Sequence, residues 1–269
     1  MIRLRPLSRK KPILIAILVI ASFLSFVGKK IFDYSAPPTK EKDCDFVFPA
    51  NEDQTKPTSI AAPPLERSLP FEQLGGFIND ASCLNKTAIY GIVNVSAVED
   101  VQRALQFARE NHLKVTPAGQ RHSMGGQAFI RAGLVLDMMA FNRITLDKQH
   151  KRVNAQAGAS WVQIQQLPDK EGLAVKAMQS INIPTVGGTL SVNAHGIAHD
   201  PGQVAPTVRS FRIMLSNGQI KTASPTENSE LFRLALGGYG LFGVILDADL
   251  DVVDKTRASR VVPQGNHTA

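Results

Sequence analysis

Alternation of hydrophobic and polar residues predicts regular secondary structure from about residue 89 onward. The apolar run at 89–95 is typical of a strand, and residues 98–109 then place apolar side chains at helical spacing. Ser96 and Glu99 stand before this helix in the S-x-x-E pattern of a capping box. Residues 113–119 predict a second strand, which completes a strand–helix–strand unit.

The rest of the body consists of short elements in no regular order. The same patterns predict a buried strand at 134–138, a hairpin at 143–158, a helix at Ser160–Leu167, a hairpin at 210–224, a helix at 229–236 and a strand at 244–253. Asn217-Gly218 is the strongest turn signal, because a two-residue hairpin turn of this kind needs positive φ at both positions. Strands and helices mixed in this way, with no internal repeat, indicate an α+β domain.

An apolar N-terminal segment stands apart from this body. Residues 12–28 carry no charge, and their length suffices for a short membrane-spanning helix. A cleaved signal peptide is the alternative, but no convincing small-residue cleavage site follows the segment. More basic residues precede the segment than follow it. We therefore expect a single-pass signal-anchor with a cytoplasmic N-terminus and the domain on the periplasmic or extracytoplasmic side of the membrane.

These patterns divide the chain into five parts. We expect a basic cytoplasmic tail at 1–11, the transmembrane signal-anchor at 12–28, a Pro-rich linker at 29–72, the folded domain at 73–256 and a polar tail at 257–269. Two cysteines supply neither a disulfide framework nor a four-cysteine zinc site. In an extracytoplasmic compartment Cys44 and Cys83 either pair or remain free thiols, and the sequence is consistent with both.

The net charge of +7 does not indicate a nucleic-acid partner. The first 30 residues hold seven basic side chains and no acidic one, and the rest of the chain balances 23 basic against 23 acidic side chains. A nucleic-acid-binding domain needs positive charge spread over a folded face. The charge pattern therefore argues against this class of protein.

Three glycines match the dinucleotide fingerprint G-x-G-x-x-G, at Gly238, Gly240 and Gly243. A predicted helix precedes them and a predicted strand follows, whereas the fingerprint requires the reverse order. We interpret these glycines as a chain reversal that packs close to a flat group, not as a Rossmann site.

Two histidines and an aspartate resemble a metal triad, namely His195, His199 and Asp200. Ligands at i and i+4 share a face only on a helix, and Gly196 and the Pro-Gly pair at 201–202 favour a loop. A metal hydrolase built on these residues is the weaker reading, and we expect no metal site.

Two glycine-rich segments, which we expect to be loops, carry the strongest functional signal, at 117–129 and 184–196. Successive backbone N–H groups in tight glycine-rich turns form an anion-binding concavity, which can cradle a pyrophosphate. Ser123, Thr185 and Ser191 add hydroxyl donors. Two ordinary surface loops are the alternative, but the occurrence of both segments after strands favours a shared site.

The order of these motifs resembles the FAD-binding domain of the vanillyl-alcohol oxidase and p-cresol methylhydroxylase (PCMH) flavoprotein family. In that family a strand–helix–strand unit leads to a pyrophosphate loop with a His-Ser pair, here His122-Ser123, and then to V-G-G-x-x-S, here Val186–Ser191. A hairpin, a helix and a glycine-rich strand, here Gly238–Ile245, follow. The resemblance covers about residues 80–255. The His122 segment is similar to cytokinin dehydrogenases, and the later motifs are similar to aldonolactone and decaprenylphosphoryl-ribose oxidases.

This resemblance implies a PCMH-type fold of two α/β subdomains with FAD as the cofactor. The residues that it places around the pyrophosphate and along the rest of FAD are Pro117, Ala118, Gly119, Gln120, Arg121, His122, Ser123, Met124, Gly125, Gly126, Gln127, Ala128, Ser180, Thr185, Val186, Gly187, Gly188, Ser191, Val192, Asn193, Ala194, His195 and Ile245. His195 would orient flavin or substrate, although a purely structural hydrogen bond explains it equally well.

His122 occupies the position at which many family members attach the flavin covalently through its 8α-methyl carbon. A neutral imidazole is a suitable nucleophile for that bond. Covalent members usually have Gly before this His, and this chain has Arg121, whose guanidinium could instead neutralise phosphate. The resemblance therefore leaves both covalent and non-covalent FAD open.

The function implied is an FAD-dependent oxidoreductase that transfers a hydride from a hydroxyl- or amine-bearing carbon to FAD. A sugar, an alditol or an aldonolactone would be the small-molecule substrate. Family members usually continue into a substrate domain, which we do not find before Ala269. The alternative is a non-catalytic FAD-binding module that needs a partner. The partners expected are the membrane, an electron acceptor or a second chain with the substrate domain.

Overall fold

The computed structural model describes Ser25, residues 47–48, 69–196 and 202–255. The chain divides into two units, Met1–Cys44 and Asp45–Ala269, and the description below concerns the second. The predicted signal-anchor at 12–28 lies outside the described residues apart from Ser25. Among the helices that are described, none combines the length and the apolar character needed to span a bilayer.

A four-stranded sheet contains the predicted strand–helix–strand unit. Its strand order is β2 (Phe71–Leu74), β5 (Gly91–Asn94), β7 (Leu134–Asp137) and β6 (Val115–Ala118). Strands β5 and β6 both run parallel to β7, because helix α2 (Val98–Glu110) returns the chain between them. The prediction of this unit is confirmed.

A small antiparallel sheet lies earlier in the chain, with the order β1 (Val47–Phe48), β3 (Phe77–Ile78) and β4 (Thr87–Ala88). Strand β1 belongs to the stretch that we expected to be a Pro-rich linker, so part of that stretch pairs with the domain. Cys83 follows β3 and is disulfide-bonded. Of the two alternatives for this residue, the disulfide therefore holds and the free thiol does not.

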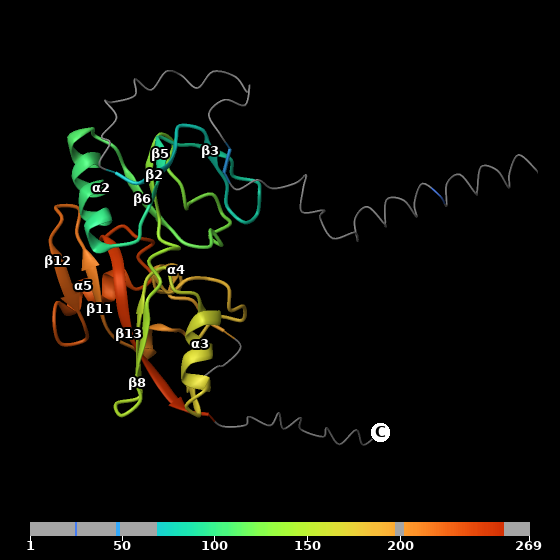
Figure 1. Cartoon of the computed structure of the whole chain (residues 1–269), viewed down its shortest axis with the longest axis vertical. Helices are drawn as coiled ribbons and strands as arrows, with labels where there is room; N and C mark the ends of the chain where they lie inside the picture. The colour runs from blue at the N-terminus through green and yellow to red at the C-terminus, as the bar shows by residue number, and fades with distance from the viewer. Residues whose placement is uncertain (1–24, 26–46, 49–68, 197–201, 256–269) are drawn as a thin grey trace, which may run out of the picture. The chain divides into compact units, whose positions relative to one another are not determined.

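A larger antiparallel sheet forms the second half of the domain. Its order is β12 (Ile220–Ala223), β11 (Val208–Met214), β13 (Val244–Asp254), β9 (Arg152–Gln156) and β8 (Ile144–Asp147), with β10 (Leu173–Val175) also paired to β13. Both predicted hairpins and the final strand are confirmed. Figure 1 shows β13 running through this sheet and α2 beside the first one.

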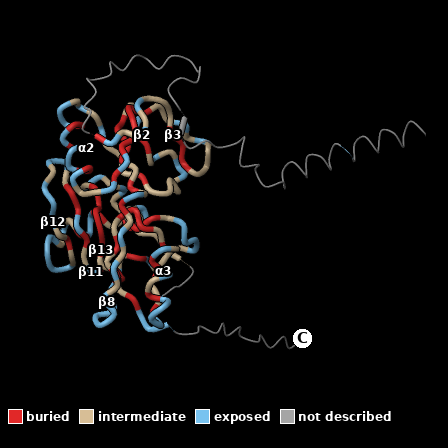
Figure 2. Tube along the Cα trace, viewed as in Figure 1, coloured by how far each residue is buried: buried red, intermediate tan, exposed pale blue. Residues whose placement is uncertain are grey.

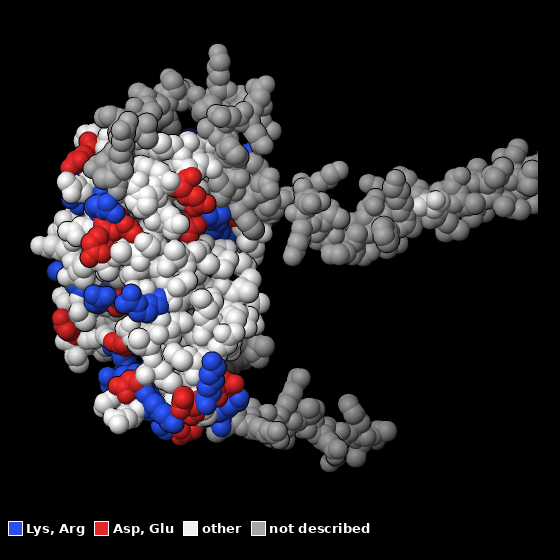
Figure 3. Space-filling model, viewed as in Figure 1, with Lys and Arg blue, Asp and Glu red and all other residues white. Residues whose placement is uncertain are grey.

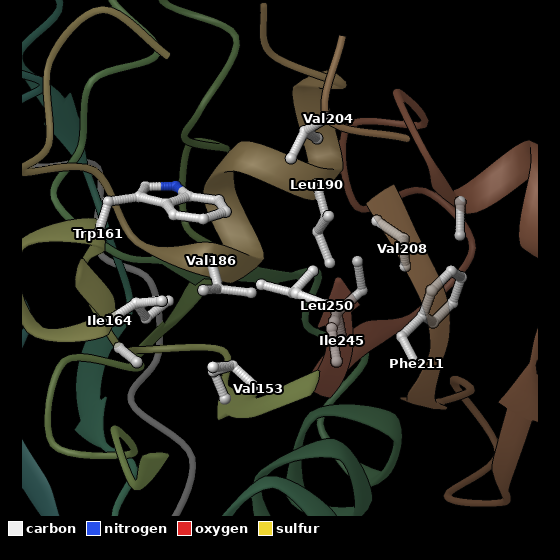
Figure 4. Packing of buried hydrophobic residues seen from close by; sticks show 14 of the residues in the cluster. Val153, Trp161, Ile164, Val186, Leu190, Val204, Val208, Phe211, Ile245 and Leu250 are labelled. Atoms are coloured by element: carbon white, nitrogen blue, oxygen red, sulfur yellow. The ribbon is translucent and has the colours of Figure 1, made fainter. Parts of the chain in front are cut away.

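Three short helices and one 3₁₀ turn accompany the larger sheet. They are α3 (Trp161–Asp169), α4 (Val186–Val192), η1 (Ala205–Thr207) and α5 (Ser229–Ala235). The predictions of α3 and α5 are confirmed. The segment at 184–196 was interpreted as a loop, and that is wrong for its middle part. Val186 and Leu190 of α4 are fully buried (Figure 4), and this packing outweighs the poor helix propensity of two glycines.

The start of α2 differs from the predicted capping box by one residue. Ala97 is the N-cap, and the carboxylate of Asp100 accepts hydrogen bonds from the backbone N–H groups of Ser96 and Ala97 and from the Ser96 hydroxyl. Glu99 takes no part in these bonds. The buried Asp100, not the exposed Glu99, therefore fixes the helix start.

The turn between β11 and β12 also differs from its prediction. Gly218 has φ of +85°, but Asn217 is not in the positive-φ region. The Gly218 N–H donates to the carbonyl oxygen of Leu215, which makes a longer turn with one left-handed residue. The glycine was identified correctly and the turn type was not.

Three hydrophobic clusters stabilise the described part of the domain, and Figure 2 shows that the buried positions of the two larger ones follow the interior strands. The first joins α3, α4 and the larger sheet. The second joins α2 and the first sheet to Met214 and Leu246 of the larger sheet. The two sheets are thus parts of one packed body. On the face seen in Figure 3, acidic and basic side chains are interspersed.

Candidate functional site

A cavity of about 590 Å³ lies where the two sheets meet, a volume typical of small-molecule and cofactor sites. Both glycine-rich segments line it, together with the chain reversal before β13. From the first segment and β6 come Val115 to Met124 and Gln127 to Ile130, and from the second come Pro184, Thr185, Gly187, Gly188, Thr189, Ser191, Val192 and Ala194. The predicted convergence of the two segments is confirmed.

The two segments touch directly at Gly119 and Thr185. A Cβ atom on Gly119 would lie 2.2 Å from Thr185 Oγ1, so only glycine fits at this position. Thr185 is nearly fully buried and caps α4, since its hydroxyl accepts from the backbone N–H of Gly188. The backbone N–H of Gly187 donates to the carbonyl oxygen of Ala157, 2.9 Å away. These contacts fix the floor of the cavity.

The first segment has an irregular backbone held by polar contacts. Arg121 has φ of +58°, a conformation that favours glycine, and its guanidinium lies 3.0 Å from the Asp137 carboxylate at the end of β7. Both side chains are mostly buried, at 12% and 14% exposure. The Arg121 charge, for which phosphate neutralisation was one alternative, is therefore already paired with a carboxylate, although Arg121 still lines the cavity.

His122 lies on the cavity wall with a defined orientation. Its Nδ1 is 2.8 Å from the carbonyl oxygen of Gln120. A carbonyl accepts only, so Nδ1 is the nitrogen that donates, and in the neutral ring Nε2 is the nitrogen with the lone pair.

A cluster before β4 supports the first segment from outside the cavity. The Ala81 N–H donates to the carbonyl oxygen of Arg121, and Asn85 Nδ2 donates to that of Met124. The buried carboxylate of Asp80 accepts from Ser82 and Asn85. Burial by itself raises the pKa of Asp80, but hydrogen bonds from Ser82, Asn85 and Gly126 outweigh burial and hold this pKa below its usual value.

Six of the residues predicted for the site do not line the cavity: Gly125, Gly126, Ser180, Val186, Asn193 and His195. Val186 faces the hydrophobic core, and Asn193 ends α4 in the left-handed conformation while its side chain contacts Gln203. His195 is exposed and pairs through its backbone with Gln203. Ile245 lines the cavity as predicted.

Several cavity residues were missed by sequence reasoning. The chief ones are Thr116, Met138, Ala157, Gln179, Ile181, Tyr239 and Leu241. Tyr239 and Leu241 lie inside the G-x-G-x-x-G stretch, where the interpretation as a chain reversal close to a flat group could have pointed to them. Gln179 precedes the predicted Ser180 by one position. Thr116 and Ala157 have no sequence signal of their own.

The reversed order of the G-x-G-x-x-G stretch is confirmed, with α5 before it and β13 after it. Gly240 has φ of +75° and lines the cavity with Gly243. Of the metal triad, His199 and Asp200 lie outside the described residues. Within residues 69–196 and 202–255, no group of His, Cys, Asp and Glu is arranged to hold a metal ion.

The donor set of the cavity fits a flavin dinucleotide. Backbone N–H groups of the first segment are available to a diphosphate, whereas those of Gly187 and Gly188 already donate within the protein. Apolar side chains such as Met138, Ile181 and Ile245 offer a surface to a flat ring. Thr116 Oγ1 and Gln179 Nε2 are buried polar atoms with no hydrogen-bond partner among the described residues, and both belong to cavity-lining residues. Unpaired buried polar atoms at a cavity wall are what a polar ligand would satisfy.

Residues 89–224 match a family described as FAD binding domain. Decaprenylphosphoryl-beta-D-ribose oxidase of Mycolicibacterium smegmatis is 31% identical over 184 residues, which are 67% of this chain and 40% of that protein. Cytokinin dehydrogenase 2 of Arabidopsis thaliana is 30% identical over 161 residues, 59% of this chain and 32% of that protein. L-gulonolactone oxidase of Bos taurus is 30% identical over 159 residues, which are 59% of this chain and 36% of that protein. The chain spans about a third of the length of the curated relatives it matches.

Proposed function

The chain belongs to the FAD binding domain family, and from this premise we propose that it is the cofactor-binding part of an FAD-dependent oxidoreductase. The single observation that carries the proposal is the shared cavity, which two glycine-rich segments far apart in the sequence both line. Relatives named as oxidases and dehydrogenases support the reaction class.

Each segment has a distinct part in the proposed binding. The backbone N–H groups of Gly119 to Ser123 would hold the diphosphate beside Thr185 and Gly188, while Ile181, Ile245 and the Gly240 turn would contact the flat ring. When bound, FAD supplies the capacity to accept a hydride. The protein supplies a fixed orientation and an apolar wall that keeps water from the ring.

We propose that His122 attaches the flavin covalently and that Nε2 is the nitrogen that forms the bond to the 8α-methyl carbon. The methyl group and the imidazole would each lose a proton, and the two electrons would pass to the flavin ring and from it to oxygen. Its support is the Nδ1 contact to Gln120, which leaves the Nε2 lone pair available at the cavity wall. Acid precipitation of the flavin-loaded full chain should leave the flavin with the protein pellet, and His122→Ala should release it into the supernatant. Release of flavin from the unaltered chain would contradict covalent attachment without touching FAD binding.

The substrate that we propose is a small polyhydroxylated compound such as a sugar, an alditol or an aldonolactone, by likeness to relatives with names of that kind. Reduction of the bound flavin under anaerobic conditions, followed by its visible absorption, tests this class. Bleaching by at least one such compound supports it. If the chain holds FAD but none of these compounds bleaches the flavin, the proposed substrate class is wrong for this chain acting alone.

A second candidate function is an FAD-binding module that turns over no substrate unaided. It is favoured by exposed apolar side chains at the cavity wall: Ile181 is 50% exposed, Tyr239 58% and Leu241 84%. We propose that a second chain with a substrate domain covers them. Flavin that is bound but bleached only after addition of such a partner would distinguish this function from the first.

For residues 12–28 our proposal is a membrane anchor that leaves the domain on the extracytoplasmic side. Protease added to sealed spheroplasts should cleave the domain from the anchored chain. Protection of the domain until the membrane is lysed would contradict this orientation.

A further inference from the structure

A chain of hydrogen bonds links the hydrophobic core to the cavity wall. The indole Nε1 of Trp161 donates to Thr189 Oγ1 at 2.8 Å, and the Thr189 hydroxyl donates to Gln179 Oε1 at 3.0 Å. Trp161 and Thr189 are almost fully buried, at 1% and 2% exposure, and Trp161 lies close to α4 in Figure 4. Thr189 and Gln179 line the cavity.

This chain fixes which way the Gln179 amide faces. An indole N–H donates and never accepts, so it occupies a lone pair of the Thr189 hydroxyl. In the structure the single hydroxyl hydrogen is donated to Gln179 Oε1, so Oε1 faces Thr189 and Nε2 faces away from it. The two amide end groups of Gln179 thus have different surroundings that the core determines.

Gln179 Nε2 is buried and has no acceptor among the described residues. A buried donor without an acceptor destabilises a protein by about 1–3 kcal/mol, so such a group calls for an explanation. The other side-chain polar atoms of this hydrogen-bonded series, on Trp161, Thr189 and Gln179, all have partners. Gln179 itself lies in the wall of the cavity. A ligand acceptor in the cavity would satisfy the donor.

We propose that Gln179 Nε2 donates a hydrogen bond to a carbonyl oxygen or unprotonated ring nitrogen of the flavin, and so raises the reduction potential of the ring. This inference rests on the proposed FAD binding and deepens it. A neutral amide suits a neutral acceptor, whereas a diphosphate is better served by the backbone N–H groups near Gly119. The wall continues beyond Gln179 into Ile181 and Pro184, which are apolar and suit a ring. Reduction adds electron density to the ring, so a fixed donor favours the reduced form.

The experiment compares variants of the full chain, with FAD as the probe. Gln179→Glu keeps an oxygen that accepts from Thr189, but it replaces the donor by a carboxylate. Gln179→Leu removes both groups. The matched control is Gln165→Leu, because Gln165 bonds to the sulfur of Met178 and to the Asn182 amide and does not line the cavity. Thr189→Val keeps Gln179 but removes the bond that orients it.

Three quantities are measured for each variant: the dissociation constant for FAD, the visible absorption spectrum of the bound flavin and its midpoint potential. We expect Gln179→Leu to weaken FAD binding about tenfold, the value of one hydrogen bond. Gln179→Glu should lower the midpoint potential further than Gln179→Leu, and Thr189→Val should have a smaller effect of the same sign. Gln165→Leu should match the unaltered chain. Thermal unfolding of each apoprotein identifies a variant that fails to fold. If one of Gln179→Glu and Gln179→Leu does not fold, the other still tests the role of the donor.

The outcomes separate this inference from the proposed function. An unaltered chain that binds no FAD would overturn both. If the unaltered chain binds FAD but folded Gln179 variants keep its potential and spectrum, the donor does not contact the ring and only this inference is wrong. If the Gln179 variants change the affinity for FAD but not the midpoint potential, this inference is likewise wrong and the proposed function stands.

Discussion

The two glycine-rich segments that line the cavity are held in different ways. The second segment folds into α4, whose Val186 and Leu190 are fully buried in the main hydrophobic cluster and whose start is capped by Thr185. The first segment has no regular structure between Gly119 and Phe129, and its shape depends on polar contacts from Asp80 and Asn85.

This difference separates stability from ligand affinity. A change in α4 acts on the core, so it lowers the free energy of unfolding of the whole domain. A change in the cluster that supports the first segment acts mainly on the positions of backbone N–H groups at the cavity wall. Local polar support of this kind can be lost without global unfolding.

The largest effect is expected for Leu190→Ala. Truncating this fully buried side chain should lower the free energy of unfolding by about 2–5 kcal/mol. Urea denaturation of the apoprotein measures it, with Ile183→Ala, at a side chain 45% exposed just before α4, as the control. A loss below about 1 kcal/mol would show that α4 is not part of the core.

The next effect is expected for Gly119→Ala, at the contact between the segments. The added Cβ would lie 2.2 Å from Thr185 Oγ1, and overpacking of this kind destabilises by about 1–3 kcal/mol. FAD binding should weaken with it. The double variant Gly119→Ala/Thr185→Gly should recover part of the stability, and strictly additive effects of the two changes would contradict the contact.

A smaller effect on stability, but a clear one on FAD affinity, is expected for Asp80→Asn. The asparagine amide cannot accept as many hydrogen bonds as the carboxylate does from Ser82, Asn85 and Gly126, so the first segment should loosen and the dissociation constant for FAD should rise about tenfold. Fluorescence titration measures it. Unchanged affinity would remove the distinction between the two segments.

The same substitution changes the dependence of stability on pH. The pKa of Asp80 is lowered in the folded protein, so the carboxylate stabilises the fold above the usual aspartate pKa of about 4, and this contribution is lost as the pH falls through the lower folded-state value. Asp80→Asn should therefore show a shallower loss of stability in acid than the unaltered chain. The pKa of Asp100 is also lowered, so part of the acid dependence should remain in the variant.

Periodicity and turn chemistry predicted most of the fold. The strand–helix–strand unit, both hairpins and α3 followed from local patterns, because their apolar positions repeat with the period of the element that they form. Helix α4 did not, because Gly187 and Gly188 lower helix propensity and only tertiary packing offsets them. The start of α2 was misplaced because Ser96-Glu99 and Ala97-Asp100 fit the same spacing, and burial selects the second.

The candidate site was predicted in outline and missed in its supports. The glycine-rich segments have a local signal, since tight turns need glycine. Gln179 has none, because its orientation depends on Trp161 and Thr189, which come from two other elements. Asp80 is likewise an ordinary carboxylate in the sequence. Only the folded chain brings it within reach of Gly126.

Hydrogen exchange of the full chain with and without FAD tests the central claim most directly. Convergence of the two segments on one cofactor predicts that FAD slows the exchange of backbone amides at 117–128 and at 185–194 together, while the β11–β12 turn around Gly218 stays unchanged. Protection confined to one segment, or absent from both, would contradict a shared FAD site.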